Sequence, residues 1–523
     1  MLGLIYFSTA SFGLGALLPR MRYVEFGETG MRMIFGYAIL ILLLFFLHVL
    51  LRIDLSTTCR TIFYLAAICA VLRGIWLRDV VRPAVLLHPG VAFIGVGVIC
   101  IFANGGINYL PTTNDEITNW LGVSEIIHFV GDFVVARPGL NHAGYVPGWR
   151  LLLLAPWQFS GAVSPGMSAA AAYVPHVAVT ALLFDIIVHQ LRVNFSLNDT
   201  KAWLWAWAVV LLFLAAEGFG RLWPLYLLIE PPQIHFYAAT FMLLITAEFA
   251  EAPRRYLFAV CGIVLAAAYL LKAAAITLVA GVGAYFLWQC ISDWRQRTFE
   301  LKNTLIAGSL LLLPVAIVMA AWSRFPADAG LINSPFNIFS EFLQPIPHFA
   351  DMAVHLFSAV FQYTINYKFI LLLAALVGMA TAWMVGSSRR TIFAFFVFCF
   401  VYFLALFVFH LIGFSTSPTN LRLISIPRYS RVVVQLAHGI GLLMLVIGFL
   451  SLPFARWREL LDRLLNEKTI LLAVLMLATS GRKPIRKMLL GLPIGMFLHL
   501  VFDGAWNNTD VFWWPFTGVG FED

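Results

Sequence analysis

Two adjacent carboxylates, Asp115 and Glu116, stand at the start of a polar loop in a chain that is otherwise strongly apolar. A carboxylate at the mouth of an apolar cavity accepts a proton from an attacking hydroxyl group, and a neighbouring carboxylate helps to set its pKa. We therefore expect Asp115 to act as a general base, with Glu116 pointing elsewhere to orient a partner. The alternative is a helix cap, because Asp and Asn are favoured ahead of an amphipathic run.

Polar side chains also gather around other turns. His142 and Tyr145 lie in a stretch rich in Gly and Pro, residues that form turns able to present polar groups. Glu230 opens a later apolar segment, and His235 lies just inside it. We interpret these four residues as candidate substrate contacts. For Glu230 and His235 the alternative is an ordinary helix start marked by proline.

Isolated cations form a third group. Lys272 lies between two apolar runs with no other charge nearby. A lysine in such a place is costly unless its amine reaches water or meets an anion. Arg428 and Arg431 belong to a basic cluster near a late polar stretch, and arginine suits a lipid-linked phosphate. The alternative for the arginines is contact with anionic lipid head groups.

The composition places all these residues in a membrane protein. Of 523 residues, 61% are hydrophobic and only 11% are charged, and the mean hydropathy is +0.88. A soluble domain carries about 25% charged residues. Runs of about 20 apolar residues span a bilayer as helices, because a helix satisfies its own backbone hydrogen bonds. The N-terminal run has no basic region before it, so we expect a retained helix rather than a cleaved signal.

The expected class is therefore an all-α polytopic membrane protein with about 13 transmembrane helices. The apolar segments lie near 2–18, 33–51, 61–77, 84–103, 166–190, 202–216, 234–250, 256–271, 273–291, 304–322, 368–386, 391–413, 430–452, 468–479 and 488–502, with 151–163 as a further candidate.

Basic loops orient these helices, because Lys and Arg accumulate on the cytoplasmic side. The outer loops are then 104–150, 217–233, the connection at Lys272, 323–367 and 414–429. Arg52 and Arg60 do not fit this arrangement, since they fall on the outer side.

Residues 117–135 of the first outer loop have apolar side chains at helical spacing, which predicts a helix lying in the membrane interface. Glu125, His128 and Asp132 could share one face of it, either as a functional group or as a solvated polar stripe.

Cysteine and charge patterns exclude several classes. The six cysteines show no CxxC spacing, so neither a disulfide framework nor a zinc site is indicated. The net charge of +8 comes from short basic loops, which suits membrane topology and not nucleic-acid binding. His499 and Asp503 are four residues apart, but a third metal ligand is not evident, and we favour a polar pair near a helix end.

The acidic pair in the first large outer loop, the helix behind it, the Leu-Leu-Lys272 motif and the Arg428-Tyr429 motif resemble the GT-C superfamily of integral-membrane glycosyltransferases. Its bacterial members include protein mannosyltransferases and lipid A aminoarabinose transferases. The resemblance covers roughly residues 84–452. It differs in two respects: three apolar segments precede the one that leads into the acidic loop, and no large C-terminal soluble domain is present.

The resemblance implies transfer of a sugar from a polyprenyl-phosphate donor to a lipid, glycan or protein acceptor, with inversion, on the outer side of a bacterial inner (plasma) membrane. Asp115 would be the base, Glu116 its neighbour, and Lys272, Arg428 and Arg431 would bind the donor phosphate. The resemblance implies no particular cofactor, and a divalent cation is an open alternative.

The resemblance also divides the chain into N-terminal transmembrane segments (1–83), a GT-C-like catalytic core (84–466) and a C-terminal membrane segment without an assigned role (467–523). Two alternatives to the transferase stay open: a lipid-linked glycan transporter or flippase, and a glycan polymerase or ligase. Charges at the outer membrane edge rather than at mid-bilayer favour the transferase over the transporter.

Overall fold

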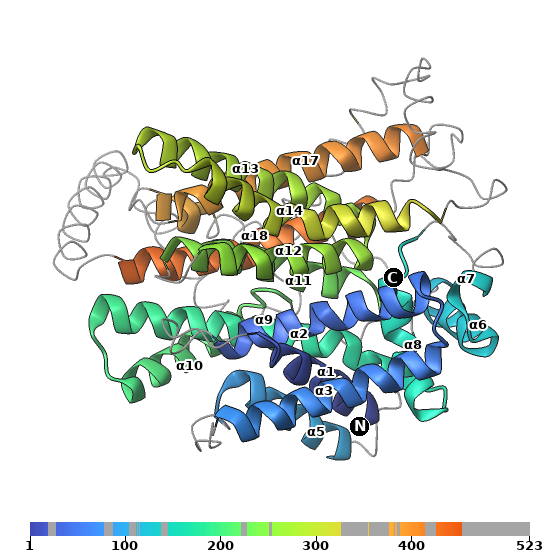
Figure 1. The fold of residues 1–523 in the computed structure, drawn as a ribbon. Helices are drawn as coiled ribbons and strands as arrows, with labels where there is room; N and C mark the ends of the chain where they lie inside the picture. The colour runs from blue at the N-terminus through green and yellow to red at the C-terminus, as the bar shows by residue number, and fades with distance from the viewer. Residues whose placement is uncertain are drawn as a thin grey trace, which may run out of the picture. The chain divides into compact units, whose positions relative to one another are not determined.

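The structure, a computed structural model (Figure 1), divides the chain into two units, Met1–Ser451 and Leu452–Asp523. The description below covers residues 1–18, 28–77, 87–103, 111, 113, 116–136, 145–220, 227–249, 254–325, 354, 376–380, 382–383, 388–413 and 425–451. The predicted C-terminal part 467–523, with His499 and Asp503, therefore lies outside the described residues.

Every regular element in this part of the chain is a helix, which confirms the all-α class. The elements are α1 (Leu2–Gly15), α2 (Glu28–Leu43), η1 (Leu44–Leu50), α3 (Leu55–Leu77), α5 (Pro89–Ala103), η2 (Glu116–Leu121), α6 (Gly122–Val130), α7 (Phe133–Ala136), α8 (Gly148–Ser160), α9 (Pro165–Phe195), α10 (Asp199–Ala215), α11 (Glu230–Phe249), α12 (Arg254–Leu271), η4 (Ala273–Ala275), α13 (Ile276–Arg295), α14 (Leu301–Trp322), α17 (Arg389–Gly413) and α18 (Ser425–Ser451).

Within the described ranges, seven helical stretches are long and apolar enough to cross a bilayer. They are Thr29–Leu50, Leu55–Arg73, Pro165–Phe195, Ala273–Arg295, Leu301–Trp322, Arg389–Val408 and Tyr429–Gly448. These helices identify a membrane protein. The count of about 13 spans stays a prediction, because segment 368–386 is described only in part and segments 468–479 and 488–502 lie outside the description.

Helix α9 lies at the centre of the packing. Helices α1, α2, α8, α11 and α18 all contact it, while α12 packs against α14 and α13 against α17 (Figure 1). Small residues allow close approach: a Cβ on Gly36 of α2 would overlap the Ser11 carbonyl of α1. The Tyr37 hydroxyl of α2 donates to the Ala171 carbonyl of α9 at 2.7 Å. Close contacts and interhelical hydrogen bonds of this kind hold helices together where lipid surrounds them.

Two ion pairs lie at opposite ends of α11. Glu230, in the first turn of α11, pairs with Lys272 of the predicted outer set, whereas Glu248, in the last turn, pairs with Arg390 of the predicted inner set. The 18 residues between the two glutamates correspond to about 27 Å of helix. Lys272 and Arg390, one residue from each predicted set, thus lie at opposite ends of α11, and the orientation of the helices in the membrane stays a prediction.

The segment predicted as one interfacial helix over 117–135 is broken into η2, α6 and α7. Gly131 ends α6 with φ of 75°, and its amide donates to the Ile127 carbonyl at 2.9 Å. Only glycine adopts this left-handed conformation without steric cost, so the apolar spacing continues through a point where the helix stops. The expected shared face is lost with it, because His128 contacts Gln158 of α8 while Asp132 lies beyond the break.

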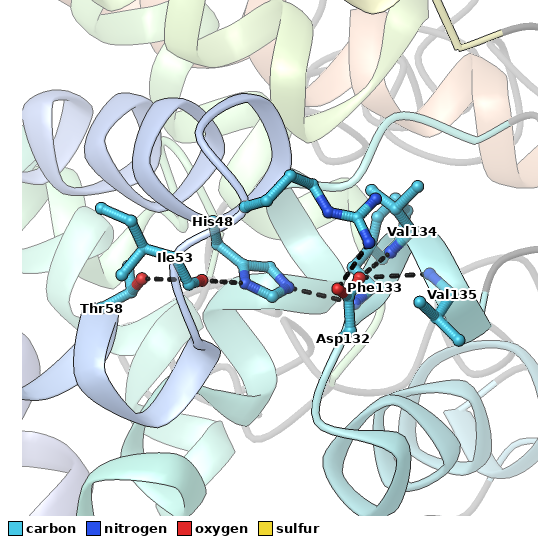
Figure 2. Close-up of polar contacts among 8 residues, drawn as sticks. His48, Ile53, Thr58, Asp132, Phe133, Val134 and Val135 are labelled. Carbon is cyan, nitrogen blue, oxygen red and sulfur yellow. Dashed lines mark hydrogen bonds and ion pairs between the residues drawn. The ribbon is translucent and has the colours of Figure 1, made fainter.

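Asp132 instead caps α7 and binds Arg52. One carboxylate oxygen accepts from the amides of Val134 and Val135, and the other lies 2.7 Å from Nη2 of Arg52. Figure 2 shows this network beside His48, which is buried in η1. The ion pair gives Arg52, which did not fit the predicted arrangement of basic loops, a carboxylate partner in the segment predicted to be an outer loop.

His48 fastens α7 to the end of η1 (Figure 2). Its Nδ1 donates to the Ile53 carbonyl at 2.8 Å, and its Nε2 accepts from the Phe133 amide at 3.0 Å. Both bonds exist together only in the neutral tautomer with its proton on Nδ1, because a carbonyl can only accept. A single imidazole therefore positions the outer segment on the helix bundle.

Candidate functional site

The acidic stretch forms a reciprocal cap at the start of η2. Thr113 Oγ1 accepts from the Glu116 amide at 3.2 Å, and Glu116 Oε2 accepts from the amide and hydroxyl of Thr113, both at 3.1 Å. This is a capping box, in which a Thr and a Glu three residues apart satisfy each other's backbone donors. Asp115 lies between them and outside the described residues. Among the described residues the cap is made by Thr113 and Glu116, and the alternative interpretation of Asp115 as a helix cap stays untested.

The other oxygen of Glu116 holds a distant segment. Oε1 accepts from the Leu227 amide at 2.7 Å, and the Leu227 carbonyl accepts from Nε1 of Trp149 at 3.0 Å. Glu116 is fully buried, and a buried carboxylate is tolerated when its oxygens receive hydrogen bonds. These contacts are those of a positioning residue: they fix the first outer loop against the chain that leads into α11.

Lys272 occupies a break between two apolar helices. Helix α12 ends at Leu271, and Lys272 is extended (φ −151°, ψ 127°) before η4 and α13 begin. Its Nζ lies 3.2 Å from Oε1 of Glu230 and 4.5 Å from the centre of the Tyr429 ring. The Glu230 side chain is 6% exposed and that of Lys272 is 22% exposed. The break between α12 and η4 therefore places the Lys272 amine beside the Glu230 carboxylate and the Tyr429 ring.

Tyr145 extends the same site. Partial burial of the Tyr145 side chain raises its pKa, and Tyr429 and Glu230 raise it further. The positive charges of Lys272 and Arg150 lower this pKa part of the way. Arg150, in the first turn of α8, is fully buried, with Cζ 5.6 Å from the centre of the Tyr145 ring and 6.0 Å from that of Trp120. We call Trp120, Tyr145, Arg150, Glu230, Lys272 and Tyr429 the Lys272 cluster.

His235 belongs to a different contact. Its Nε2 lies 2.8 Å from Nδ1 of His176 in α9, and the two buried rings meet edge to face. Residues five apart on a helix point about 140° away from each other, so Glu230 and His235 cannot serve one face of α11. His235 joins α11 to α9, and its role in substrate binding stays a prediction.

The predicted phosphate-binding arginines flank the cluster in sequence. Arg428 and Arg431 lie on either side of Tyr429 in the N-terminal part of α18, and the Arg431 side chain is exposed. The side chain of Arg428 and the whole of His142 lie outside the described residues. Of the predicted site residues, the structure thus brings Glu230, Lys272 and Tyr145 together, with Glu116 bonded to the adjoining chain.

Trp120 and Arg150 were not predicted as site residues from the sequence, and Tyr429 appeared there only as part of the Arg428-Tyr429 motif. A signal existed for Arg150, which enters an apolar run as its only charge. A fully buried charge needs nearby compensation, so such an arginine marks a polar centre. Trp120 carried no comparable signal, because aromatic residues are frequent throughout this chain.

The described residues contain no group of three or more His, Cys, Asp or Glu side chains arranged to hold a metal ion. The divalent cation therefore stays a prediction without a site in this part of the chain.

Fold and site together define an all-helical membrane protein with a polar cluster at one end of its helices. No protein-family model matches the chain, and no curated protein or solved structure shows significant similarity to it. Its function must be argued from the chemistry of the site.

Proposed function

We propose that this protein is a membrane glycosyltransferase that moves a sugar from a polyprenyl-phosphate donor to a lipid, glycan or protein acceptor at the outer face of a bacterial inner membrane. The observation that carries the proposal is the position of Lys272: a helix break presents its amine beside Glu230 and Tyr429 at the end of the bundle. The resemblance to GT-C enzymes implies the type of reaction. The Lys272 cluster supplies a cation able to bind the donor phosphate.

The leaving group in this reaction is a lipid phosphate, which gains negative charge as the glycosidic bond breaks. Lys272 has three N–H donors, and its contact with Glu230 leaves others for phosphate oxygens. Fixed cations that face developing charge lower the barrier, because they need no rearrangement during the reaction. Glu230 and the Tyr429 ring hold the amine in place, and Arg428 and Arg431 complete the proposed phosphate site.

The acceptor side of the reaction is assigned to Asp115. Its carboxylate takes the proton as the acceptor oxygen bonds to the anomeric carbon, and the bond from that carbon to the phosphate oxygen breaks on the opposite face. One displacement of this kind inverts the anomeric centre. The capping box of Thr113 and Glu116 supports the assignment, since it holds the residues on both sides of the base.

The short helices near the cluster suit a membrane-surface enzyme. Ile126, Phe129 and Val130 of α6 are exposed large apolar side chains, while Val123 and Ile127 of the same helix are buried. A helix that packs on the protein by one face and exposes apolar side chains on the other is typical of the bilayer interface. That location brings the cluster to the depth of lipid phosphates.

The test is transfer of radiolabelled sugar by the purified protein from a panel of polyprenyl-phosphate donors to membrane acceptors. The informative variants are Asp115→Asn and Lys272→Met. Lys302→Met is the matched control, because Lys302 is an exposed lysine in the first turn of α14. Wild-type transfer that collapses in both variants and persists in the control supports the proposal. Absence of transfer from every donor, together with movement of lipid-linked glycan across vesicles, would replace it with transport.

A further inference from the structure

Three side chains of the Lys272 cluster form a triangle of their own: Trp120, Tyr145 and Arg150. The ring centres of Trp120 and Tyr145 are 6.0 Å apart with their planes 31° from parallel. The Arg150 guanidinium lies 6.0 Å from the first ring and 5.6 Å from the second. Two aromatic faces and a cation therefore meet at nearly equal distances. They come from η2, the chain before α8, and α8 itself.

The triangle carries a hydrogen-bond donor that the described residues do not satisfy. Nε1 of Trp120 is buried and has no hydrogen-bond partner in this part of the chain, and the residue is only 5% exposed. A buried N–H group without an acceptor is costly, so such groups are rare outside sites that a ligand completes. Tyr145 is 42% exposed, which leaves the triangle open on one side.

We infer that Trp120, Tyr145 and Arg150 form the subsite for the glycosyl group of the donor, an inference that rests on the proposed function. A sugar ring offers apolar C–H faces to aromatic side chains and hydroxyl oxygens to N–H donors, and the triangle supplies both partners. A polyprenyl chain has no acceptor for the Trp120 indole. Tyr145 lies within the electrostatic influence of Lys272, so a sugar at the triangle is compatible with a phosphate at the lysine.

The test separates sugar recognition from phosphate recognition. Trp120→Phe keeps an aromatic ring and removes the N–H, and Tyr145→Leu removes a partly exposed ring. Trp205→Phe is the matched control, because Trp205 of α10 is 60% exposed and lies outside the cluster. For each variant, KM for the glycosylated donor and inhibition by sugar-free polyprenyl phosphate are measured, with the thermal midpoint as a check of folding.

We expect Trp120→Phe to raise the donor KM by about tenfold, the worth of one hydrogen bond. Tyr145→Leu should raise the donor KM as well, because it removes a ring that faces the sugar. Inhibition by sugar-free polyprenyl phosphate should stay unchanged in both variants. Equal weakening of donor and sugar-free lipid would assign the triangle to the phosphate and overturn the inference. Unchanged KM in both variants would reduce the triangle to packing and overturn it as well, with the proposed function intact. A wild type that transfers no sugar would overturn both.

Discussion

Nζ of Lys272 lies 3.2 Å from Oε1 of Glu230, and this ion pair joins the break after α12 to the first turn of α11. The acid is nearly buried and the lysine is partly exposed. The pair therefore links two helices and also controls the charge of the proposed phosphate site.

The pair should show strong coupling in a double-mutant cycle. Lys272→Met removes a positive charge from beside a nearly buried carboxylate, which is more harmful than removing both partners. We expect the double variant with Glu230→Gln to recover about 1–3 kcal/mol of stability relative to the sum of the single changes. Thermal or denaturant unfolding of the four proteins in detergent measures this coupling free energy. Additive single effects would show that the two side chains do not interact in the folded protein.

Glu116 should behave as a positioning residue. Glu116→Ala leaves the buried Leu227 amide without this acceptor and removes half of the capping box, so we expect a loss of about 2–4 kcal/mol, with Thr113→Ala costing about 1 kcal/mol. Unfolding midpoints and protease sensitivity of the first outer loop report both changes. Glu116→Gln retains one acceptor and should keep the wild-type pH profile of transfer. A changed pH profile in this variant would make Glu116 the titrating group instead.

Tyr145 should titrate above the usual range for tyrosine. Its raised pKa means that the folded protein favours the neutral phenol. The resulting stability is fully present below the unfolded pKa of about 10 and is lost as pH rises through the folded pKa. Difference absorbance of wild type against Tyr145→Phe locates the transition. Because the Lys272 charge lowers this pKa, Lys272→Met should move the Tyr145 transition to still higher pH. A transition that does not move would show that Lys272 does not influence Tyr145.

The network in Figure 2 predicts two unequal losses of stability. His48→Phe leaves the buried Phe133 amide without its acceptor, at about 1–3 kcal/mol. It also removes one donor to the Ile53 carbonyl, which keeps the Thr58 hydroxyl at 3.4 Å. Arg52→Met breaks a pair whose side chains are 43% and 27% exposed, so its cost should stay below about 1 kcal/mol. Unfolding experiments on the two variants under the same conditions compare their losses of stability. Equal losses would contradict the central place given to His48.

The helices could be predicted from the sequence because each depends on a long local apolar run. The expected segments 33–51 and 304–322, for example, overlap the structural stretches Thr29–Leu50 and Leu301–Trp322. The break at Gly131 was missed because the apolar spacing continues past it. Segment 151–163 was a candidate span, yet α8 has 13 residues and is almost wholly buried, which makes it too short to cross a bilayer.

The candidate site was predictable only as a set of isolated residues. Lys272 stood out because a lone charge in an apolar region needs an explanation, and Glu230 because it opens a helix. Their contact with each other joins residues 42 positions apart in sequence. The local pattern contains no information on such a contact. Counting positions around α11 would have separated His235 from Glu230, since that step needs helix geometry alone.

Leu227 makes both of its polar contacts through its main chain. Its amide donates to Glu116, and its carbonyl accepts from Trp149. Any apolar side chain of suitable size could stand at this position without altering either bond. Proline is the exception, since it has no amide hydrogen to give. The joint between the first outer loop and α11 is therefore specified by the path of the backbone, and it would survive extensive change of side chain at position 227.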